Sequence, residues 1–461
     1  MKKLALLLSL ILSFSILISC SNTDKVEGNE DVVVVEEPVY KDMNGAEFRF
    51  MSQTPVDYYP EIGASESGDK IIKRYADVNE MFNCNFIVDM IDSTSSSALA
   101  TFTTRVAAMT EDVPDLIDIH GREAYPFYEQ GVLYPVNSIS TIDLTQTCWG
   151  TPNFLQYGMF DNVNNYGIFP YDWNTMPQFA GMILVNNELL KLLSTKNPYA
   201  MMENGEWTWD NFLALVKECT VKDGEKQIFG LGIQDVNYHN RTVLFSNGVS
   251  PVIKQNEEFV FGYNTPEAFA AMDYNAKFYT DKLVKDGNYD IFVNGDCVFY
   301  SCESWAGTEQ RENYPAFELN DYGFLPFPSG SNVEYGTTSA FVHMGRRLNW
   351  FVDKASTDKE DLGTVLTAVF APLDGTQPEN WKIVSKDILF HHTEDYNNFM
   401  KMMDNMNYDY SCQLSKVNDR INSAIAPAMK GTKTPAEALG AATEQINTAI
   451  KESFTSSTIT E

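Results

Sequence analysis

The segment VPDLIDIH, residues 113–120, decides the fold class, because it reads as a short buried strand that completes an alternation of strands and helices. It leads directly into HGREAYPFY at residues 120–128. Four segments precede it, and they alternate between strand-like and helix-like patterns: AEFRFMS (46–52), GDKIIKRYADVNEMFN (68–83), CNFIVDMI (84–91) and SALATFTTRVAAMTED (97–112). This β-α-β-α-β order predicts an α/β fold with a mostly parallel sheet and helical crossovers. Ligands of such sheets bind beyond the carboxyl ends of the strands, so we expect 120–128 to be a binding loop.

Later helices are marked by their capping residues. Thr208 precedes an amphipathic run to Thr220, Thr265-Pro266 opens a helix to about Val284, and the capping box at Thr434–Glu437 opens the last helix, to about Glu452. Trp207 and Trp209 flank the first of these caps, and a tryptophan at a helix start is expected to pack in the core.

The chain has 461 residues, 44% of them hydrophobic, which predicts two or three domains of ordinary size. Its formal net charge of −30 argues against nucleic acid as a partner, because phosphate backbones recruit Lys- and Arg-rich surfaces. No P-loop, GxGxxG, HExxH or GxSxG motif occurs, so we expect no enzymatic activity and no cofactor. The adjacent His391 and His392 are expected to be solvated, and we expect no metal site.

The amino-terminal residues resemble the signal of bacterial lipoproteins. Lys2 and Lys3 precede an uncharged stretch, Leu4–Ile18, which is shorter than a spanning helix and ends in Leu-Ile-Ser before Cys20. The resemblance implies cleavage after residue 19 and lipidation of Cys20, which would anchor the chain at the extracytoplasmic face of the cell membrane. The acidic residues 20–44 then form a flexible tether. The alternative is an uncleaved amino-terminal anchor.

Six cysteines remain after Cys20. They are Cys84, Cys148, Cys219, Cys297, Cys302 and Cys412. No pair has CxxC spacing, and we expect these residues to be mostly buried thiols that pack as small hydrophobes.

The order of several segments resembles the sugar-type (family 1) extracellular solute-binding proteins of bacterial ABC importers. The segments are PDLIDIHGREAYPFYEQGVLYPVN (114–137), GMILVNNELLKLL (181–193), GEWTWDNFLALVKECT (205–220), TVLFSNGVSPV (242–252), VNGDCVFYSCESWAG (293–307), DYGFLPFPSG (321–330) and GTKTPAEALGAATEQINTAI (431–450). Two departures weaken the transfer of ligand contacts: Gly295-Asp296 stands where the family has Gly-Lys, and the stretch 346–385 matches poorly.

This resemblance implies two discontinuous α/β lobes, joined by crossover hinge strands in the type II periplasmic-binding-protein arrangement. We expect lobe one to comprise 45–157 and 288–330, and lobe two 158–287 and 331–461. A monomer would capture a carbohydrate, in particular an oligosaccharide, between the lobes and deliver it to ABC permease subunits.

A sugar presents apolar C–H faces and a rim of hydroxyls, so a sugar site needs aromatic rings with carboxylates and amides around them. Trp305 falls where the family places a stacking aromatic. The other candidates lie in or near strand-end and crossover loops: Tyr125, Tyr128, Tyr171, Asp172, Trp173, Glu303, His120, Arg122 and Tyr335. Two alternatives stay open: a binding protein for a peptide or other small solute, and a surface glycoside hydrolase with paired carboxylates across the cleft.

Overall fold

The computed structural model describes residues 40–52, 58–90, 104–106, 108, 113–161, 163–169, 178–193, 195–256, 258–308, 321–342, 347–376, 382–383, 386, 389–390, 392–411 and 414–455. Residues 42–461 form one compact unit. Cys20, Cys412, His391 and most of the helix expected at 97–112 lie outside the described residues. None of the helices in the described ranges is long and apolar enough to cross a membrane.

The first sheet has the strand order β2-β1-β3-β13-β4. Its strands are β1 (Ala46–Ser52), β2 (Cys84–Met90), β3 (Leu116–His120), β4 (Gly167–Ile168) and β13 (Arg347–Phe351). Strand β1 pairs in parallel with both β2 and β3, which confirms the parallel core expected from the β-α-β pattern. Strand β13 pairs antiparallel with β3 and β4, so the complete sheet is mixed.

The second sheet has the order β10-β7-β11-β5-β12, with β6 paired to β7. Its strands are β5 (Ala180–Asn186), β6 (Val221–Asp223), β7 (Lys226–Ile233), β10 (Val284–Asp286), β11 (Cys297–Glu303) and β12 (Tyr322–Pro326). A separate hairpin joins β8 (Val252–Gln255) to β9 (Glu258–Phe261). All seven residues of β5 are buried, as are all seven of β11, because both strands are covered on their two faces.

The strand pairing differs from the expected division of the lobes. Strands β11 and β12 fall in 288–330, which was assigned to lobe one, but they pair with β5 and β7 of the second sheet. Strand β13 was assigned to lobe two and pairs with β3 of the first. Hydrophobic patterns define a buried strand without specifying which sheet it joins, so these crossings could not be read from periodicity.

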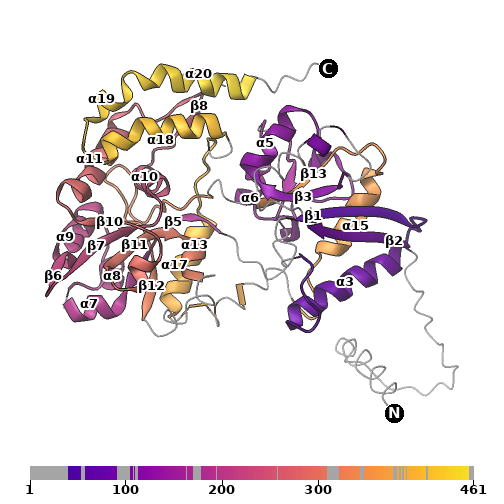
Figure 1. Cartoon of the computed structure of the whole chain (residues 1–461), viewed down its shortest axis with the longest axis horizontal. Helices are drawn as coiled ribbons and strands as arrows, with labels where there is room; N and C mark the ends of the chain where they lie inside the picture. The colour runs from indigo at the N-terminus through magenta and orange to yellow at the C-terminus, as the bar shows by residue number, and fades with distance from the viewer. Residues whose placement is uncertain are drawn as a thin grey trace, which may run out of the picture. The chain divides into compact units, whose positions relative to one another are not determined.

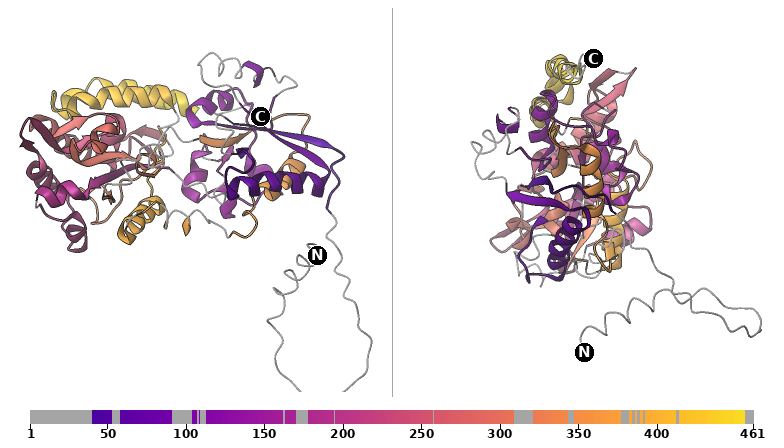
Figure 2. Two further views of the ribbon diagram at one scale, coloured as in Figure 1. Left: turned by 60° about the horizontal axis from the view of Figure 1, so that its bottom comes forward. Right: turned by 90° about the vertical axis from the view of Figure 1, so that its right-hand side faces the viewer.

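The helices lie at α3 (Glu66–Phe82), α5 (Gly121–Glu129), α6 (Pro152–Tyr157), α7 (Asn187–Leu193), α8 (Pro198–Glu203), α9 (Trp209–Cys219), α10 (Val236–Phe245), α11 (Pro266–Thr280), α12 (Asp290–Val293), α13 (Ser304–Thr308), α15 (Lys359–Phe370), α17 (Thr393–Asp404), α18 (Ser415–Met429), α19 (Pro435–Leu439) and α20 (Ala442–Thr455), with short 3-10 turns at Val136–Ser138 and Thr147–Trp149. Helices α9 and α11 confirm two of the expected helices, although the Thr208 side chain makes no capping hydrogen bond and α11 ends at Thr280 rather than near Val284. The capping box at Thr434 is present, but the last helix was wrongly expected to be continuous. It breaks between α19 and α20, where Gly440 lowers helix propensity, and α20 lies beside α18 (Figures 1 and 2).

The segment expected as a binding loop at 120–128 is largely helix α5. Ala124, Phe127 and Tyr128 lie on one helical face and are buried, and this packing outweighs the helix-breaking tendencies of Gly121 and Pro126. The i, i+3, i+4 spacing of the three buried residues was a visible signal for a helix.

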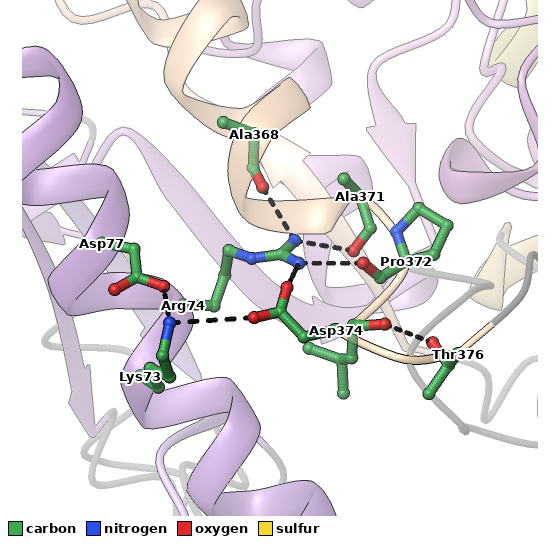
Figure 3. A network of polar contacts seen from close by, with 9 residues as sticks. Lys73, Arg74, Asp77, Ala368, Ala371, Pro372, Asp374 and Thr376 are labelled. Atoms are coloured by element: carbon green, nitrogen blue, oxygen red, sulfur yellow. Dashed lines mark hydrogen bonds and ion pairs between the residues drawn. The ribbon is translucent and has the colours of Figure 1, made fainter. Parts of the chain in front are cut away.

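The end of α15 is held by an arginine on α3, and α15 packs against α3 (Figure 1). The Arg74 guanidinium donates hydrogen bonds to the carbonyl oxygens of Ala368 (3.1 Å), Ala371 (3.0 Å) and Pro372 (2.8 Å), and to Asp374 Oδ1 (3.2 Å) (Figure 3). The last carbonyls of a helix lack intrahelical partners, so Arg74 caps α15 from a distant part of the sequence.

We expect Arg74→Ala to lower the free energy of unfolding by about 2–3 kcal/mol, because three carbonyls lose a charged donor at once. Urea denaturation of the variant and the parent protein measures this loss. Lys73→Ala is the matched control: its ammonium pairs with Asp77 and Asp374 but its side chain is 61% exposed, so the midpoint should hardly move. Equal losses for the two variants would contradict the capping role.

A buried carboxylate fixes α17 to β12. Asp395 is 0% exposed, and its Oδ1 accepts hydrogen bonds from the Tyr199 hydroxyl (2.6 Å) and the Phe324 backbone N–H (2.8 Å). Burial raises the pKa of Asp395 to about 6, although both hydrogen bonds and nearby His392 oppose the rise and the charge of Glu394 adds to it.

The folded protein should therefore gain stability from this group as the pH falls from about 7.5 through 6. The folded-state pKa lies above the unfolded value, so the folded state binds the proton more tightly, by about 1–1.5 kcal/mol at pH 5. Urea titrations of the parent and of Asp395→Asn at about pH 7.5 and at pH 5 isolate the contribution of this carboxyl group to stability. A stability difference between the two proteins that is the same at both pH values would refute it.

Candidate functional site

A polar cavity of about 200 Å³ lies where α5, α10 and α18 approach one another. Its lining comprises Arg122, Asp235, Asn237, Tyr238, Arg241, Phe341, Asn418, Asp419 and Asn422. A narrow hollow with no room for a water molecule adjoins it through Asp235 and Tyr238. It extends to the end of β11, where it is lined by Gln234, His239, Thr242, Ser301, Cys302 and Glu303. The two hollows together define what we call the polar site.

The start of α10 positions two residues of the polar site, Asp235 and Tyr238. Asp235 is the N-cap, and its Oδ1 accepts hydrogen bonds from the backbone N–H groups of Asn237 (2.7 Å) and Tyr238 (3.1 Å). Burial, followed by the charges of Glu303 and Asp235, raises the pKa of Tyr238. The phenol therefore stays neutral and can both donate and accept a hydrogen bond.

Glu303 closes β11 at the inner end of the polar site. It is 7% exposed, and its backbone N–H donates to Gln234 Oε1 at 3.0 Å. The pairing of β11 with β5 shifts register between Cys302 and Glu303, an irregularity that re-aims the final side chain.

A buried ion pair adjoins the cavity through Arg241. Arg241 is 2% exposed and pairs with Asp409, which is 0% exposed. The same guanidinium donates to Ser411 Oγ at 2.9 Å, to Asn418 Oδ1 and to Asn422 Oδ1 at 3.3 Å. These contacts connect α10 to the segment before α18 and to α18 itself, so the amides of α18 are held by Arg241.

His239 has a structural role beneath the site. Its Nδ1 lies 2.8 Å from Ser301 Oγ and its Nε2 lies 2.9 Å from Asn275 Oδ1. Burial lowers the pKa of His239 to about 4, so the ring is neutral at physiological pH. No group of metal-binding side chains occurs among the described residues.

The structure brings two of the sequence-predicted site residues, Glu303 and Arg122, into the polar site. His120 precedes α5, and its backbone N–H donates to the Glu123 carboxylate at 3.2 Å. Trp305, on α13, is half-buried and packs against a core cluster. Tyr171, Asp172 and Trp173 lie outside the described residues.

Three tyrosines predicted for the site lie elsewhere. The Tyr125 hydroxyl donates to the Ser453 carbonyl oxygen at 3.1 Å, and Tyr128 is 6% exposed in an aromatic cluster with Phe160. Tyr335 is 45% exposed and donates to the Met202 carbonyl oxygen. None of the three is among the residues that line the polar site.

Sequence reasoning missed the residues of α10 and α18 in the polar site: Asp235, Asn237, Tyr238, Asn418, Asp419 and Asn422. The first was detectable, because an Asp before an amphipathic run is an N-cap signal. The residues of α18 were not, since only the fold brings them beside α10.

Two predictions about packing are confirmed. Trp207 Nε1 donates to the Pro326 carbonyl oxygen at 2.8 Å, and Trp209 stacks on Tyr274 with ring centroids 4.2 Å apart. The five described cysteines, 84, 148, 219, 297 and 302, are buried thiols.

Comparison with known proteins adds a family match. A family model described as bacterial extracellular solute-binding protein matches residues 88–372. No curated protein matches the sequence.

Several solved structures are similar in fold. A cyclic α-maltosyl-1,6-maltose binding protein from Arthrobacter globiformis has a TM-score of 0.65 at 15% identity, covering 88% of this chain and 100% of its own. UgpB from Mycobacterium tuberculosis, solved with glycerophosphocholine, has a TM-score of 0.61 at 14% identity, covering 88% and 99%. The GacH receptor of Streptomyces glaucescens, solved without ligand and with acarbose, has a TM-score of 0.59 at 14% identity, covering 88% and 99%. The fold is therefore the two-lobed α/β arrangement expected from the sequence.

Proposed function

We propose that this chain, which belongs to the family of bacterial extracellular solute-binding proteins, captures a carbohydrate in the polar site and delivers it to an ABC permease. The observation that carries the proposal is the composition of the polar site. Carboxylates, amides and a guanidinium surround a cavity that also contains the rings of Tyr238 and Phe341. Hydroxyl rims need such donors and acceptors, and the C–H faces of a sugar pack on aromatic rings.

The charges of the polar site favour a neutral ligand. Arg241 is already neutralised by Asp409, and Arg122 is accompanied by the carboxylates of Asp235 and Asp419. A carboxylate and a guanidinium can each bind two hydroxyls of an uncharged sugar. A strongly anionic ligand would be repelled by the several carboxylates of the site. The saccharides bound by the similar structures from A. globiformis and S. glaucescens support the same class of ligand.

The amino-terminal residues support a membrane anchor as part of this function. We infer that Cys20 carries the lipid, that residues 20–44 tether the folded part, and that the protein works at the outer surface of the membrane beside its permease. Mass spectrometry of the protein isolated from bacterial membranes tests this: a diacylglycerol on Cys20 is expected, and an intact Met1 would refute it.

A titration of the full-length protein with a panel of neutral mono- and oligosaccharides tests ligand capture. We expect at least one sugar to bind with Kd below about 1 mM and to raise the melting temperature. Arg122→Ala should weaken that binding about tenfold or more, because the exposed Arg122 side chain lines the cavity. Tyr335→Phe, which changes an exposed hydroxyl outside the cavity, is the matched control.

One other class of solute is supported by a specific observation. UgpB, similar in fold, was solved with glycerophosphocholine, which is not a saccharide. If no sugar stabilises the protein and glycerophosphodiesters do, the carbohydrate proposal is wrong and this second class replaces it.

A further inference from the structure

A second cavity, of about 400 Å³, lies at the other end of the second sheet. It is lined by residues of α7 and α8, by Asp321 before β12 and by the start of α17: Asn187, Leu190, Lys191, Thr195, Lys196, Asn197, Pro198, Tyr199, Glu203, Asp321, His392 and Glu394. Strand β5 runs antiparallel to β11, with Ala180 beside Glu303 and Val185 beside Phe299. The two ends of β5 are about 17–20 Å apart, so this cavity is separate from the polar site.

Part of the cavity lining is an ion network formed within the protein. Asp321 accepts hydrogen bonds from Lys191 Nζ (2.6 Å) and Asn187 Nδ2 (2.9 Å), and His392 Nε2 lies 3.1 Å away. These donors lower the pKa of Asp321 to about 2 against the opposing effect of burial. Asp321 and Lys191 therefore neutralise one another and leave no charge for a ligand.

Two further carboxylates line the cavity and have no ion-pair partner among the described residues. Glu203, the last residue of α8, and Glu394, in the first turn of α17, line the cavity and make no ion pair within the described part of the chain. Lys196 on the rim makes none either, so two free carboxylates face one free ammonium. The surplus of unpaired charge in the cavity is negative.

The third feature of this cavity is an aromatic and aliphatic wall. Leu190, Pro198 and Tyr199 line it, and the Tyr199 hydroxyl is committed to Asp395, which leaves the ring rather than the hydroxyl to a ligand. A ring face and nearby carboxylates together bind organic cations, because the quadrupole of the ring and the carboxylates attract the same charge.

We propose that this cavity is a second ligand site, which takes a small organic cation, an amine or a guanidinium on a short aliphatic chain. The cationic group lies between Glu203 and Glu394, and the aliphatic part packs on Tyr199, Leu190 and Pro198. This proposal does not depend on carbohydrate binding, because the two sites share no residue.

Isothermal titration of the full-length protein with agmatine tests the proposal, with 1,4-butanediol as the uncharged counterpart. We expect saturable 1:1 binding of agmatine with Kd near or below about 1 mM, weakened by added salt, and no binding of the diol. The double variant Glu203→Gln/Glu394→Gln should weaken agmatine binding about tenfold or more.

Glu218→Gln/Glu225→Gln is the matched control, since it removes the same charge from exposed positions of the same lobe that do not line the cavity. Agmatine binding should change less than about twofold in this control. Absence of saturable binding at 10 mM agmatine, about ten times the expected Kd, overturns the proposal, as does equal binding to the two double variants. Thermal melts confirm that each variant is folded, and unchanged sugar binding by the first variant separates this site from the polar site.

Discussion

Replacing Asp409 with alanine is expected to lower the free energy of unfolding by about 3–5 kcal/mol, because the variant leaves a buried guanidinium without its counter-ion. Arg241 is 2% exposed and cannot turn to water without breaking its hydrogen bonds to Ser411 and Asn418. Urea or thermal unfolding followed by circular dichroism measures the loss.

The control for this prediction removes both charges together. Arg241→Met/Asp409→Leu should be considerably more stable than Asp409→Ala, because no charge is left buried and unpaired. Asp419→Asn, an exposed carboxylate of the same cavity, should hardly affect stability. If Asp409→Ala and Asp419→Asn lose equally little, the buried pair does not stabilise this part of the fold.

This ion pair also matters for the polar site. Asn418 and Asn422 line the cavity and receive hydrogen bonds from Arg241, so removing the pair frees the amides to take other rotamers. The double variant is therefore expected to bind sugar more weakly than the parent even where its stability is restored. Comparison of Asp409→Ala with Arg241→Met/Asp409→Leu would then show stability recovered in the double variant while its affinity for sugar stays low.

Local patterns in the sequence were sufficient to define many of the elements. Alternation predicted β1, and helical spacing predicted α3 and α9, because each pattern arises from burying one face of one element. The cap and N1 proline at Thr265-Pro266 predicted α11. The assignment of β11, β12 and β13 to sheets could not be predicted in the same way. All seven residues of β11 are buried, and such a strand fits the middle of either sheet equally well.

The candidate site shows the same limit: local patterns in the sequence do not specify which elements the fold brings together. Glu303 was chosen as a hydroxyl acceptor by residue type, and it lines the polar site. Arg122 was chosen from its position after a strand, and it also lines the polar site. Tyr128 was chosen by the same rule, but it lies on the buried face of a helix that had been expected as a loop. The residues of α18 reach the polar site only through tertiary packing. Arg241 contacts Asn418, for example, although the two residues are more than 170 positions apart in the sequence.

Trp350→Ala is expected to cost about 3–5 kcal/mol in the free energy of unfolding, because it leaves a cavity in the core beside β13. Trp350 is 0% exposed, stacks on Phe160 with centroids 5.0 Å apart, and donates from Nε1 to the Ile119 carbonyl oxygen at 2.9 Å. A Cβ added at Gly167 on β4 would lie 2.9 Å from the indole, so the ring already fills its space. Guanidinium unfolding measures the loss.

The contrast with Trp305 tests whether burial explains this cost. Trp305 is only half-buried, so Trp305→Ala should destabilise the protein much less than Trp350→Ala. Trp350→Phe should lie between them, since it keeps a ring against Phe160 but loses the hydrogen bond to Ile119. If Trp350→Ala proved as mild as Trp305→Ala, burial of the ring would not explain the expected cost, and the Trp350 side chain would contribute little to the packing beside β13.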